Sequence, residues 1–397
     1  MPLSRSFTEF FESEKAGATA LLACTLVALV LANSALGPDY QAFWQSPLLG
    51  LSLEHWVNDA LMAIFFLLIG LELEREFYVG ELSKLGHALL PIFAAMGGIL
   101  VPAGIHYALN ANTATQVGMG IPMATDIAFA LGALALLGKR IPAALKVFLA
   151  ALAVMDDLGA IVVISVFYSS HFSLPYLFGA GGVYLLLLGA NRLRVLTLWP
   201  YLLGGALMWF LMLRSGVHAS VAGVLLAFAI PFTGRTGKED SPSHRTEHAL
   251  QRPVAFLILP LFALANAGVA FDGPWRENLA SANSLGIVAG LVLGKPLGIV
   301  LVSYLAVAAG ICRLPGDLGW RHVMGVGMLG GIGFTMSIFI TNLAFAGAAT
   351  EINSSKMAIL LASVIAGLAG LLWLLCCGRP ARQASGLADE VQDLDAD

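Results

Sequence analysis

Charged residues are scarce in this sequence. Only 12% of its 397 residues are Asp, Glu, Lys or Arg, whereas 58% are hydrophobic. Soluble globular domains carry about 25% charged residues. A water-soluble fold of this length could not bury so much apolar surface, so we expect a lipid bilayer to surround the protein.

The sequence contains no pattern typical of a metal or disulfide site, or of a nucleic-acid-binding surface. The four cysteines, Cys24, Cys312, Cys376 and Cys377, contain no C-x-x-C spacing, which argues against a metal site or a disulfide framework. No run of basic residues suggests a nucleic-acid partner, and the net charge of −4 is small. We therefore expect neither nucleic acid nor a resident cofactor.

Long apolar runs dominate the sequence. A transmembrane helix needs about 20 mostly apolar residues. The hydrophobic pattern predicts an all-α membrane protein with twelve such helices, at residues 16–36, 57–72, 87–108, 119–137, 145–168, 174–190, 196–213, 215–232, 254–271, 284–311, 323–346 and 356–377. With twelve spans, both termini lie on the same side of the membrane.

Basic residues divide unequally between the two sides. Of the 21 Lys and Arg residues, seventeen fall on the side of the termini: Arg5, Lys15, Arg75, Lys84, Lys139, Arg140, Lys146, Arg192, Arg194, Arg235, Lys238, Arg245, Arg252, Arg313, Arg321, Arg379 and Arg382. Three fall on the opposite side, namely Arg214, Arg276 and Lys356, and Lys295 lies within a span. Because positive residues remain cytoplasmic, we expect both termini to be in the cytoplasm.

Residues 1–378 are expected to form a single transmembrane domain. The connection at 37–56 alternates apolar and polar residues and is either a small external hairpin or an irregular loop. Residues 233–253 are polar and are expected to form a cytoplasmic loop. The acidic end at 379–397 is expected to be disordered.

Ionisable residues inside the spans are few, and such residues are usually functional because they are costly in a bilayer. Asp156 and Asp157 are adjacent near the middle of the fifth span. Asp126, next to Thr125, lies in the fourth span just after Pro122. Each of these aspartates is therefore predicted to be either a functional group or a buried structural charge.

Two further spans carry unusual features. The tenth contains a lone ammonium group, Lys295, followed by Pro296. The eleventh reads GGIGFTMS over 330–337, and its glycines, including Gly331 and Gly333, can unwind the helix and free backbone carbonyls. The hydroxyls of Thr335 and Ser337 are expected to bond within their own helix.

Two neighbouring carboxylates cannot both ionise cheaply in a low-dielectric medium. A small hard cation such as Na⁺ or Li⁺ can supply the missing positive charge through oxygen ligands. The cation and protons then compete for the same oxygens, and a site that faces one side at a time would exchange them. The structural alternative is a buried ion pair, for example between Asp157 and Lys295.

Seven strings together resemble the NhaA-type sodium/proton antiporters of bacteria, in order along nearly the whole chain. They are NDALMAIFFLLIGLE (58–72), IPMATDIAFALG (121–132), MDDLGAI (155–161), SGVHA (215–219), ILPLFALANAG (258–268), LGKPLG (293–298) and GGIGFTMSIFI (330–340). The resemblance implies twelve helices in two inverted repeats, whose fourth and eleventh helices are broken and cross at mid-membrane.

The same resemblance implies roles for single residues. Asp156 and Asp157 would bind Na⁺ or Li⁺ and carry protons, with Asp157 as the main ligand. Asp126 would offset the positive ends of the half-helices, and Lys295 the negative ends. The family exports the cation, imports more than one proton for each, is active at alkaline pH, and usually forms homodimers through an external hairpin.

The resemblance also suggests residues that respond to pH: Glu72, Glu76, Glu247, His248 and His218. Glu74 departs from the family, which often has lysine there, and Gln251-Arg252-Pro253 replaces the usual His-Pro. The charges in and near the cytoplasmic loop therefore differ from those of the family, and the family's threshold pH cannot be transferred to this chain.

Other functions fit less well. Intramembrane prenyltransferases need a further acid three residues after the aspartate pair, and this chain has Ala160 there. Intramembrane aspartyl proteases need Gly-x-Gly-Asp, whereas Asp317 follows Gly316 in a loop. An ion channel lines a continuous pore, but here the charges gather at one depth, which favours an alternating-access carrier.

Overall fold

The computed structural model describes residues 5–83, 85–168, 173–232, 241–271, 275–315 and 317–377. Its α-helices up to residue 229 are α1 (Arg5–Ala32), α2 (Gly37–Gln45), α3 (Leu53–Trp56), α4 (Met62–Tyr78), α5 (Leu85–Asn110), α6 (Ile127–Leu136), α7 (Ala143–Phe167), α8 (Leu174–Arg192), α9 (Trp199–Ser215) and α10 (Val221–Ala229). Those that follow are α11 (Pro242–Pro253), α12 (Leu259–Asn266), α13 (Trp275–Leu279), α14 (Ala282–Ala289), α15 (Lys295–Ala308), α16 (Trp320–Gly330), α17 (Phe334–Ala344) and α18 (Ala349–Cys377). The acidic end at 379–397 lies outside the described residues.

Several long helices contain a turn of different pitch. The π-helical turns η1 (Val57–Leu61), η5 (Val254–Ile258) and η6 (Gly290–Gly294) join α3 to α4, α11 to α12 and α14 to α15. The 3₁₀ segments are η2 (Glu81–Ser83), η3 (Ala114–Met123) and η4 (Gly138–Arg140). Such π turns often mark functional positions in helices.

Eight helices in the described ranges are long and apolar enough to cross a membrane: 15–32, 53–78, 88–110, 143–167, 174–192, 242–266, 282–308 and 349–377. Two more spans are bent pairs, η3 with α6 at 42° and α16 with α17 at 48°. These pairs coincide with the predicted fourth and eleventh spans. The all-α membrane class is confirmed, with up to ten spans.

The predicted total of twelve spans is not confirmed. The remaining two candidates correspond to α9, with 17 residues, and α10, with nine. The expected polar loop at 233–253 is also wrong over its second half, because residues 242–253 form α11. Ser241 caps this helix by accepting a hydrogen bond from His244 N, and Pro242 at the first turn favours a helix start.

The connection at 37–56 contains a small hairpin. Strand β1 (Pro47–Leu48) pairs antiparallel with β2 (Leu51–Ser52). The two turn residues, Leu49 and Gly50, both have positive φ angles, 52° and 89°. This geometry matches the tight turn that follows the natural twist of a two-stranded ribbon.

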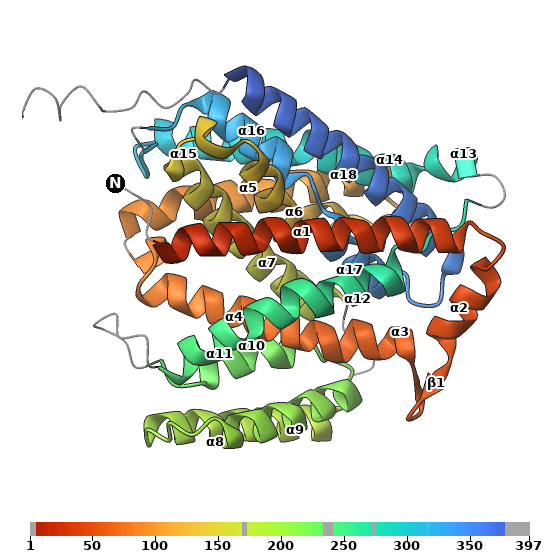
Figure 1. The fold of residues 1–397 in the computed structure, drawn as a ribbon, viewed down its shortest axis with the longest axis vertical. Coiled ribbons are helices and arrows are strands. Elements are labelled where there is room, and N and C mark those ends of the chain that lie inside the picture. Colours follow the sequence, from red (N-terminus) through yellow and green to blue (C-terminus); the bar gives the residue numbers. More distant parts are fainter. Residues whose placement is uncertain are drawn as a thin grey trace, which may run out of the picture.

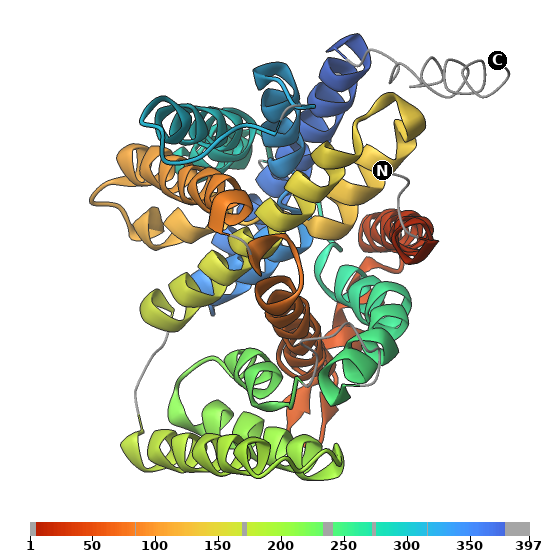
Figure 2. The same ribbon diagram turned by 90° about the vertical axis from the view of Figure 1, so that its left-hand side faces the viewer.

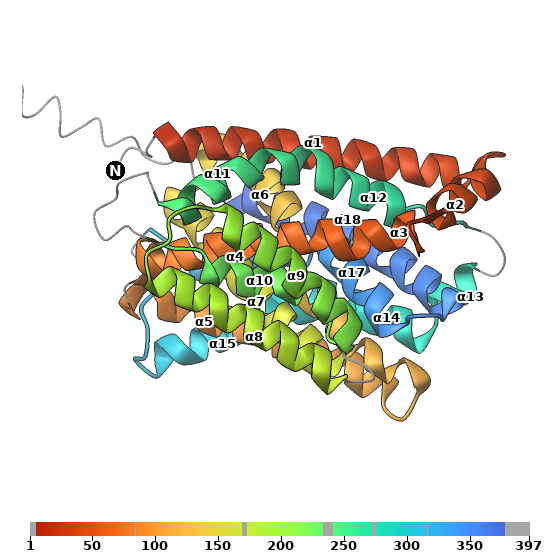
Figure 3. The same ribbon diagram turned by 90° about the horizontal axis from the view of Figure 1, so that it is seen from below.

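The long helices run roughly along one direction (Figures 1 and 3). At one end of the molecule α1 begins and α18 ends (Figure 1). Arg75 in the last turn of α4 and Arg321 in the first turn of α16 belong to helix ends on this side, and we call it the basic face. The other end carries α2, α13 and the hairpin; we call it the hairpin face.

The helices form two groups. In one group, α8, α9 and α10 pack together at one edge of the molecule (Figure 2), and α10 packs on α4. In the same group α11 packs on α4, and α1 packs on α12 and also on α6 of the other group. In the other group, the order of long helix, bent pair and long helix occurs twice, first as α5, η3–α6 and α7, then as α14–α15, α16–α17 and α18. Both bent pairs therefore lie within this second group, which we call the repeat group.

Candidate functional site

The breaks in the two bent pairs meet inside the repeat group. Residues 124–126 separate η3 from α6, and residues 331–333 separate α16 from α17. The backbone N–H of Asp126 donates to the carbonyl of Ile332 at 2.6 Å, so the two breaks are joined directly. Two helix N-termini and two helix C-termini consequently lie at one place in the protein interior.

Glycine permits this close approach. A Cβ atom on Gly331 would lie 2.4 Å from the carbonyl oxygen of Leu291, and one on Gly333 would lie 2.2 Å from Oγ of Ser337. The first of these neighbours is backbone and cannot turn away. The predicted glycine break thus lies where two backbones touch.

We expect Gly331→Ala to destabilise the purified protein by about 1–3 kcal/mol, because the added methyl group overpacks a rigid site. Gly181→Ala on α8 is the matched control, since its Cβ would meet nothing within 4 Å, and it should be neutral or mildly stabilising. Thermal unfolding in detergent measures both variants. Equal melting temperatures for the two would contradict the close approach at Gly331.

Asp126 binds both N-terminal helix ends. Its Oδ1 accepts from the backbone N–H of Phe129 at 3.1 Å, in the first turn of α6. Its Oδ2 accepts from the backbone N–H and the hydroxyl of Thr335, at 3.0 and 2.5 Å, in the first turn of α17. A buried carboxylate is stabilised by these donors and by the positive ends of the two helix dipoles. Thr335 therefore bonds to Asp126, not within its own helix as expected.

Lys295 lies at the C-terminal ends of the other half-helices. Its Nζ donates to the carbonyl of Met123, the last residue of η3, and forms an ion pair with Oδ2 of Asp156 at 2.7 Å. Thr125 Oγ1 is 2.6 Å from the same carboxylate oxygen and 2.8 Å from the carbonyl of Gly330 at the end of α16. The suggested ion pair between Lys295 and Asp157 is wrong, because the lysine neutralises Asp156 instead.

Asp157 has a different environment from its neighbour. Both residues are 1% exposed, yet neither carboxylate oxygen of Asp157 has a hydrogen-bond partner in the described part of the chain. In Asp156, Oδ1 alone lacks one. A buried, unpaired carboxylate is costly unless it takes up a proton or a cation. Asp157 is therefore the member of the pair for which the described structure provides no hydrogen-bond partner.

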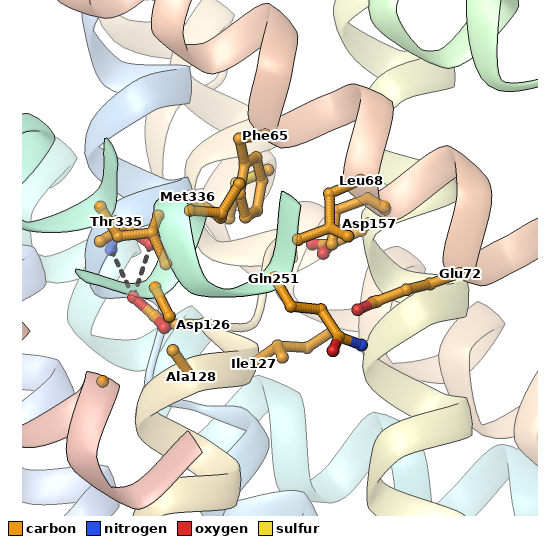
Figure 4. Close-up of a pocket in the computed structure, with 15 residues that line it drawn as sticks. Phe65, Leu68, Glu72, Asp126, Ile127, Ala128, Asp157, Gln251, Thr335 and Met336 are labelled. Carbon is orange, nitrogen blue, oxygen red and sulfur yellow. Dashed lines mark hydrogen bonds between the residues drawn. The ribbon is translucent and has the colours of Figure 1, made fainter. Parts of the chain in front are cut away.

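A cavity reaches Asp157 and Asp126 from one side of the protein (Figure 4). Its walls also include residues from α1, α4, α6, α17 and the α11–α12 helix, namely Gly17, Phe65, Leu68, Ile69, Glu72, Ile127, Ala128, Gln251, Val254, Ala255, Leu259, Thr335 and Met336. Gly17, Glu72 and Gln251 lie in the halves of their helices that are nearer the basic face. The cavity is therefore offset from the middle of the molecule towards that face.

Three of the five suggested pH-responsive residues gather near the mouth of this cavity. Glu247 is buried and pairs with Nε of Arg75 at 2.9 Å, while Glu76 pairs with Nη1 of Arg75 at 3.2 Å. Glu72 lines the cavity. His248 is exposed on α11. Arg75 is the centre of this ion-pair cluster, although the sequence analysis assigned it no role.

His218 lies apart from that cluster, towards the hairpin face. Its Nε2 is 3.4 Å from Oδ1 of Asp59, and His55 Nε2 is 2.8 Å from Oδ2 of the same carboxylate. Asp59 was not among the predicted site residues, although its charge and its position near the start of the second predicted span are signals that the sequence contains. The two ends of the molecule therefore carry separate titratable clusters.

The described residues contain no group of three or more His, Cys, Asp or Glu side chains arranged to hold a metal ion. The oxygen donors nearby match the preference of hard cations.

The family model and the relatives that match this chain all describe Na⁺/H⁺ antiporters. Residues 8–374 match the family model described as Na⁺/H⁺ antiporter 1. The chain is 66% identical to the Na(+)/H(+) antiporter NhaA of Dechloromonas aromatica over 373 residues, covering 94% of this chain and 96% of that protein. It is 57% identical to the protein of the same name from Cytophaga hutchinsonii, covering 94% and 96%, and 48% identical to the Na(+)/H(+) antiporter NhaA 2 of Pseudomonas syringae pv. syringae, covering 92% and 94%.

Proposed function

This chain belongs to the Na⁺/H⁺ antiporter 1 family, and from that premise we propose that it exchanges Na⁺ or Li⁺ for protons at Asp157, with Asp156 as the second carboxylate of the site. It is a secondary transporter and not an enzyme. The observation that carries the assignment is the buried Asp157 carboxylate, which lacks a hydrogen-bond partner among the described residues and lines a cavity.

Competition at this carboxylate is the proposed mechanism of exchange. A proton or a cation can each neutralise Asp157, but both together would leave excess positive charge in a low-dielectric interior. Loading the cation therefore expels the proton. If the loaded and protonated forms alone can turn to the other side, coupled exchange follows without a further energy source.

A second proton comes from the Lys295–Asp156 pair in this proposal. When Asp156 turns towards the bound cation, Lys295 loses the charge that stabilises its ammonium form and releases a proton. Two protons would then move inward for each cation moved outward, so the cycle would carry net charge and respond to the membrane potential.

The basic face is cytoplasmic in this proposal, because basic residues concentrate there. The cavity then opens to the cytoplasm, and both termini are cytoplasmic in a bacterial inner membrane. We further propose that the two bent pairs cross as equivalent elements of inverted repeats. The contacts of Asp126 with Thr335 and of Thr125 with Gly330 join the two pairs and support that arrangement.

The exposed hairpin suggests how two copies could associate. The side chains of Leu48 and Leu49 are 49% and 86% exposed at its turn, and a two-residue strand leaves backbone groups free for pairing with another copy. We propose a homodimer in which the two hairpins contribute to the interface.

The direct test is a pH change in everted membrane vesicles after addition of one cation at a time. We expect Na⁺ and Li⁺ to cause proton movement and K⁺ to cause little, because the site is small and buried. Ca²⁺ tests whether a divalent oxygen-seeking ion competes. A channel would pass Na⁺ without proton counterflow, and that result would overturn the proposal.

Exchange should increase as the pH on the basic face rises from 6 to 9. Na⁺ binding displaces the proton of Asp157 and, in this proposal, one from Lys295, so the apparent KM for Na⁺ should fall by about tenfold per pH unit where one proton is released and by up to about 100-fold where both are. Initial rates at saturating and at low Na⁺ across this range separate competition from a change in maximal rate. A flat profile would contradict both competition and activation at alkaline pH.

A further inference from the structure

Three asparagines from three helices join below the hairpin face, and we call them the amide triad: Asn58 in η1, Asn266 at the end of α12, and Asn342 in α17. Asn266 donates to Oδ1 of Asn58 at 2.7 Å and accepts from Nδ2 of Asn58 at 3.3 Å. Asn342 donates to Oδ1 of Asn266 at 2.6 Å.

Asn266 is the centre of this network. It is 1% exposed, and its amide also donates to the carbonyl of Phe262 at 3.0 Å. A primary amide can donate two hydrogen bonds and accept two, so Asn266 uses its whole capacity. A fully satisfied polar network in a buried position fixes the relative placement of the elements that it joins.

An aromatic layer lies between the amide triad and the Asp157 cavity. Phe339, one turn before Asn342 on α17, packs against Phe66 on α4 and Phe262 on α12, with ring centroids 5.5 and 6.4 Å apart. The ring of His218 meets Phe339 at 5.3 Å and 90°. All three phenylalanines are 1% exposed. Apolar rings followed by a satisfied amide network close the path towards the hairpin face.

The amide triad bridges the two helix groups. Asn342 belongs to α17, whose first turn holds Asp126 in the repeat group. Asn58 and Asn266 belong to α3–α4 and α12 in the other group. The hydrogen bond from Asn342 to Asn266 therefore crosses the boundary along which one group must move relative to the other if the site is to face the hairpin side.

We propose that the amide triad is a latch that keeps the hairpin side closed while the cavity is open to the basic face, and that the bond between Asn342 and Asn266 breaks and re-forms in every transport cycle. This inference rests on the proposed exchange by alternating access. One interhelical hydrogen bond in a membrane protein shifts a two-state equilibrium by roughly 3- to 10-fold. That strength allows the latch to bias the resting state without blocking the cycle.

The first experiment measures access to the site without transport. In a background lacking the four native cysteines, Met336→Cys on the cavity wall is labelled with a membrane-impermeant thiol reagent from either side. We expect Asn342→Ala to raise the labelling rate from the hairpin side by about 3- to 10-fold. The matched control is Asn110→Ala, whose amide bonds to His106 and Ala282 within the repeat group, and it should leave that rate unchanged.

The second experiment fixes the latch chemically. Asn266→Cys with Asn342→Cys, joined by a short reversible thiol cross-linker, should stop Na⁺/H⁺ exchange and recover it on reduction, while labelling from the basic side persists. Asn58→Cys with Asn266→Cys joins two residues of the same group and should retain exchange when cross-linked.

Unchanged labelling in Asn342→Ala, or full exchange in the cross-linked Asn266–Asn342 pair, would overturn the latch. Because labelling needs no ion flux, its outcome is distinct from the outcome for the proposed function. A wild-type protein without sodium-dependent proton movement would refute the exchange proposal alone.

Discussion

In everted vesicles, Asp157→Asn should abolish sodium-dependent proton movement, with rates at least about 100-fold below wild type. The amide has nearly the same size as the carboxylate, so the cavity wall keeps its shape, but it cannot carry a negative charge or exchange a proton. Moving the ion into a neutral cavity of low dielectric constant leaves its charge uncompensated. The variant should remain folded, because its wild-type carboxylate oxygens make no hydrogen bond within the described structure.

Asp39→Asn is the matched control for this change. Asp39 is exposed on α2 near the hairpin face, so the same chemical replacement should leave exchange intact. Asp157→Glu keeps the charge but moves it by one methylene group, and we expect partial activity with a raised KM for Na⁺. Near-normal exchange in Asp157→Asn would show that the Asp157 carboxylate is not needed for exchange and would contradict its proposed role.

Replacing Lys295 by Ala should both stop exchange and lower stability. Lys295 is fully buried, and its Nζ lies 2.7 Å from Asp156. Removing one member of a buried ion pair typically costs about 3–5 kcal/mol, because the remaining charge is left uncompensated. Thermal unfolding of the purified protein and exchange in vesicles should both show the loss. Lys295→Arg keeps the charge and should retain more of both properties.

A double variant tests whether the loss of stability in Lys295→Ala comes from the broken ion pair or from the loss of the lysine side chain itself. Lys295→Ala combined with Asp156→Asn removes both charges, so the loss of stability should be smaller than in Lys295→Ala alone. Exchange should stay low because the second proton carrier is missing. Equal stability of Lys295→Arg and Lys295→Ala, or no recovery in the double variant, would exclude a structural ion pair between these residues.

The sequence by itself determined the membrane environment, the two breaks and the buried carboxylates. Hydropathy and charge are local properties of the chain, so the fourth and eleventh spans could be recognised from Pro122 and the glycines at 330–333. The polar range 242–253 was misjudged because its amphipathic helix is fixed by the cap at Ser241 and by packing on α4. Its mean polarity resembles that of a loop.

Tertiary structure alone decided which groups meet. Adjacent aspartates have the same local sequence, yet Asp156 faces Lys295, which lies 139 residues away in the chain, and Asp157 faces the cavity. Likewise, Asn58, Asn266 and Asn342 are unremarkable polar residues until α4, α12 and α17 bring them together. Helix packing determines which side chains meet in a buried network. It brings together residues that are far apart along the chain, so local sequence does not reveal these partners.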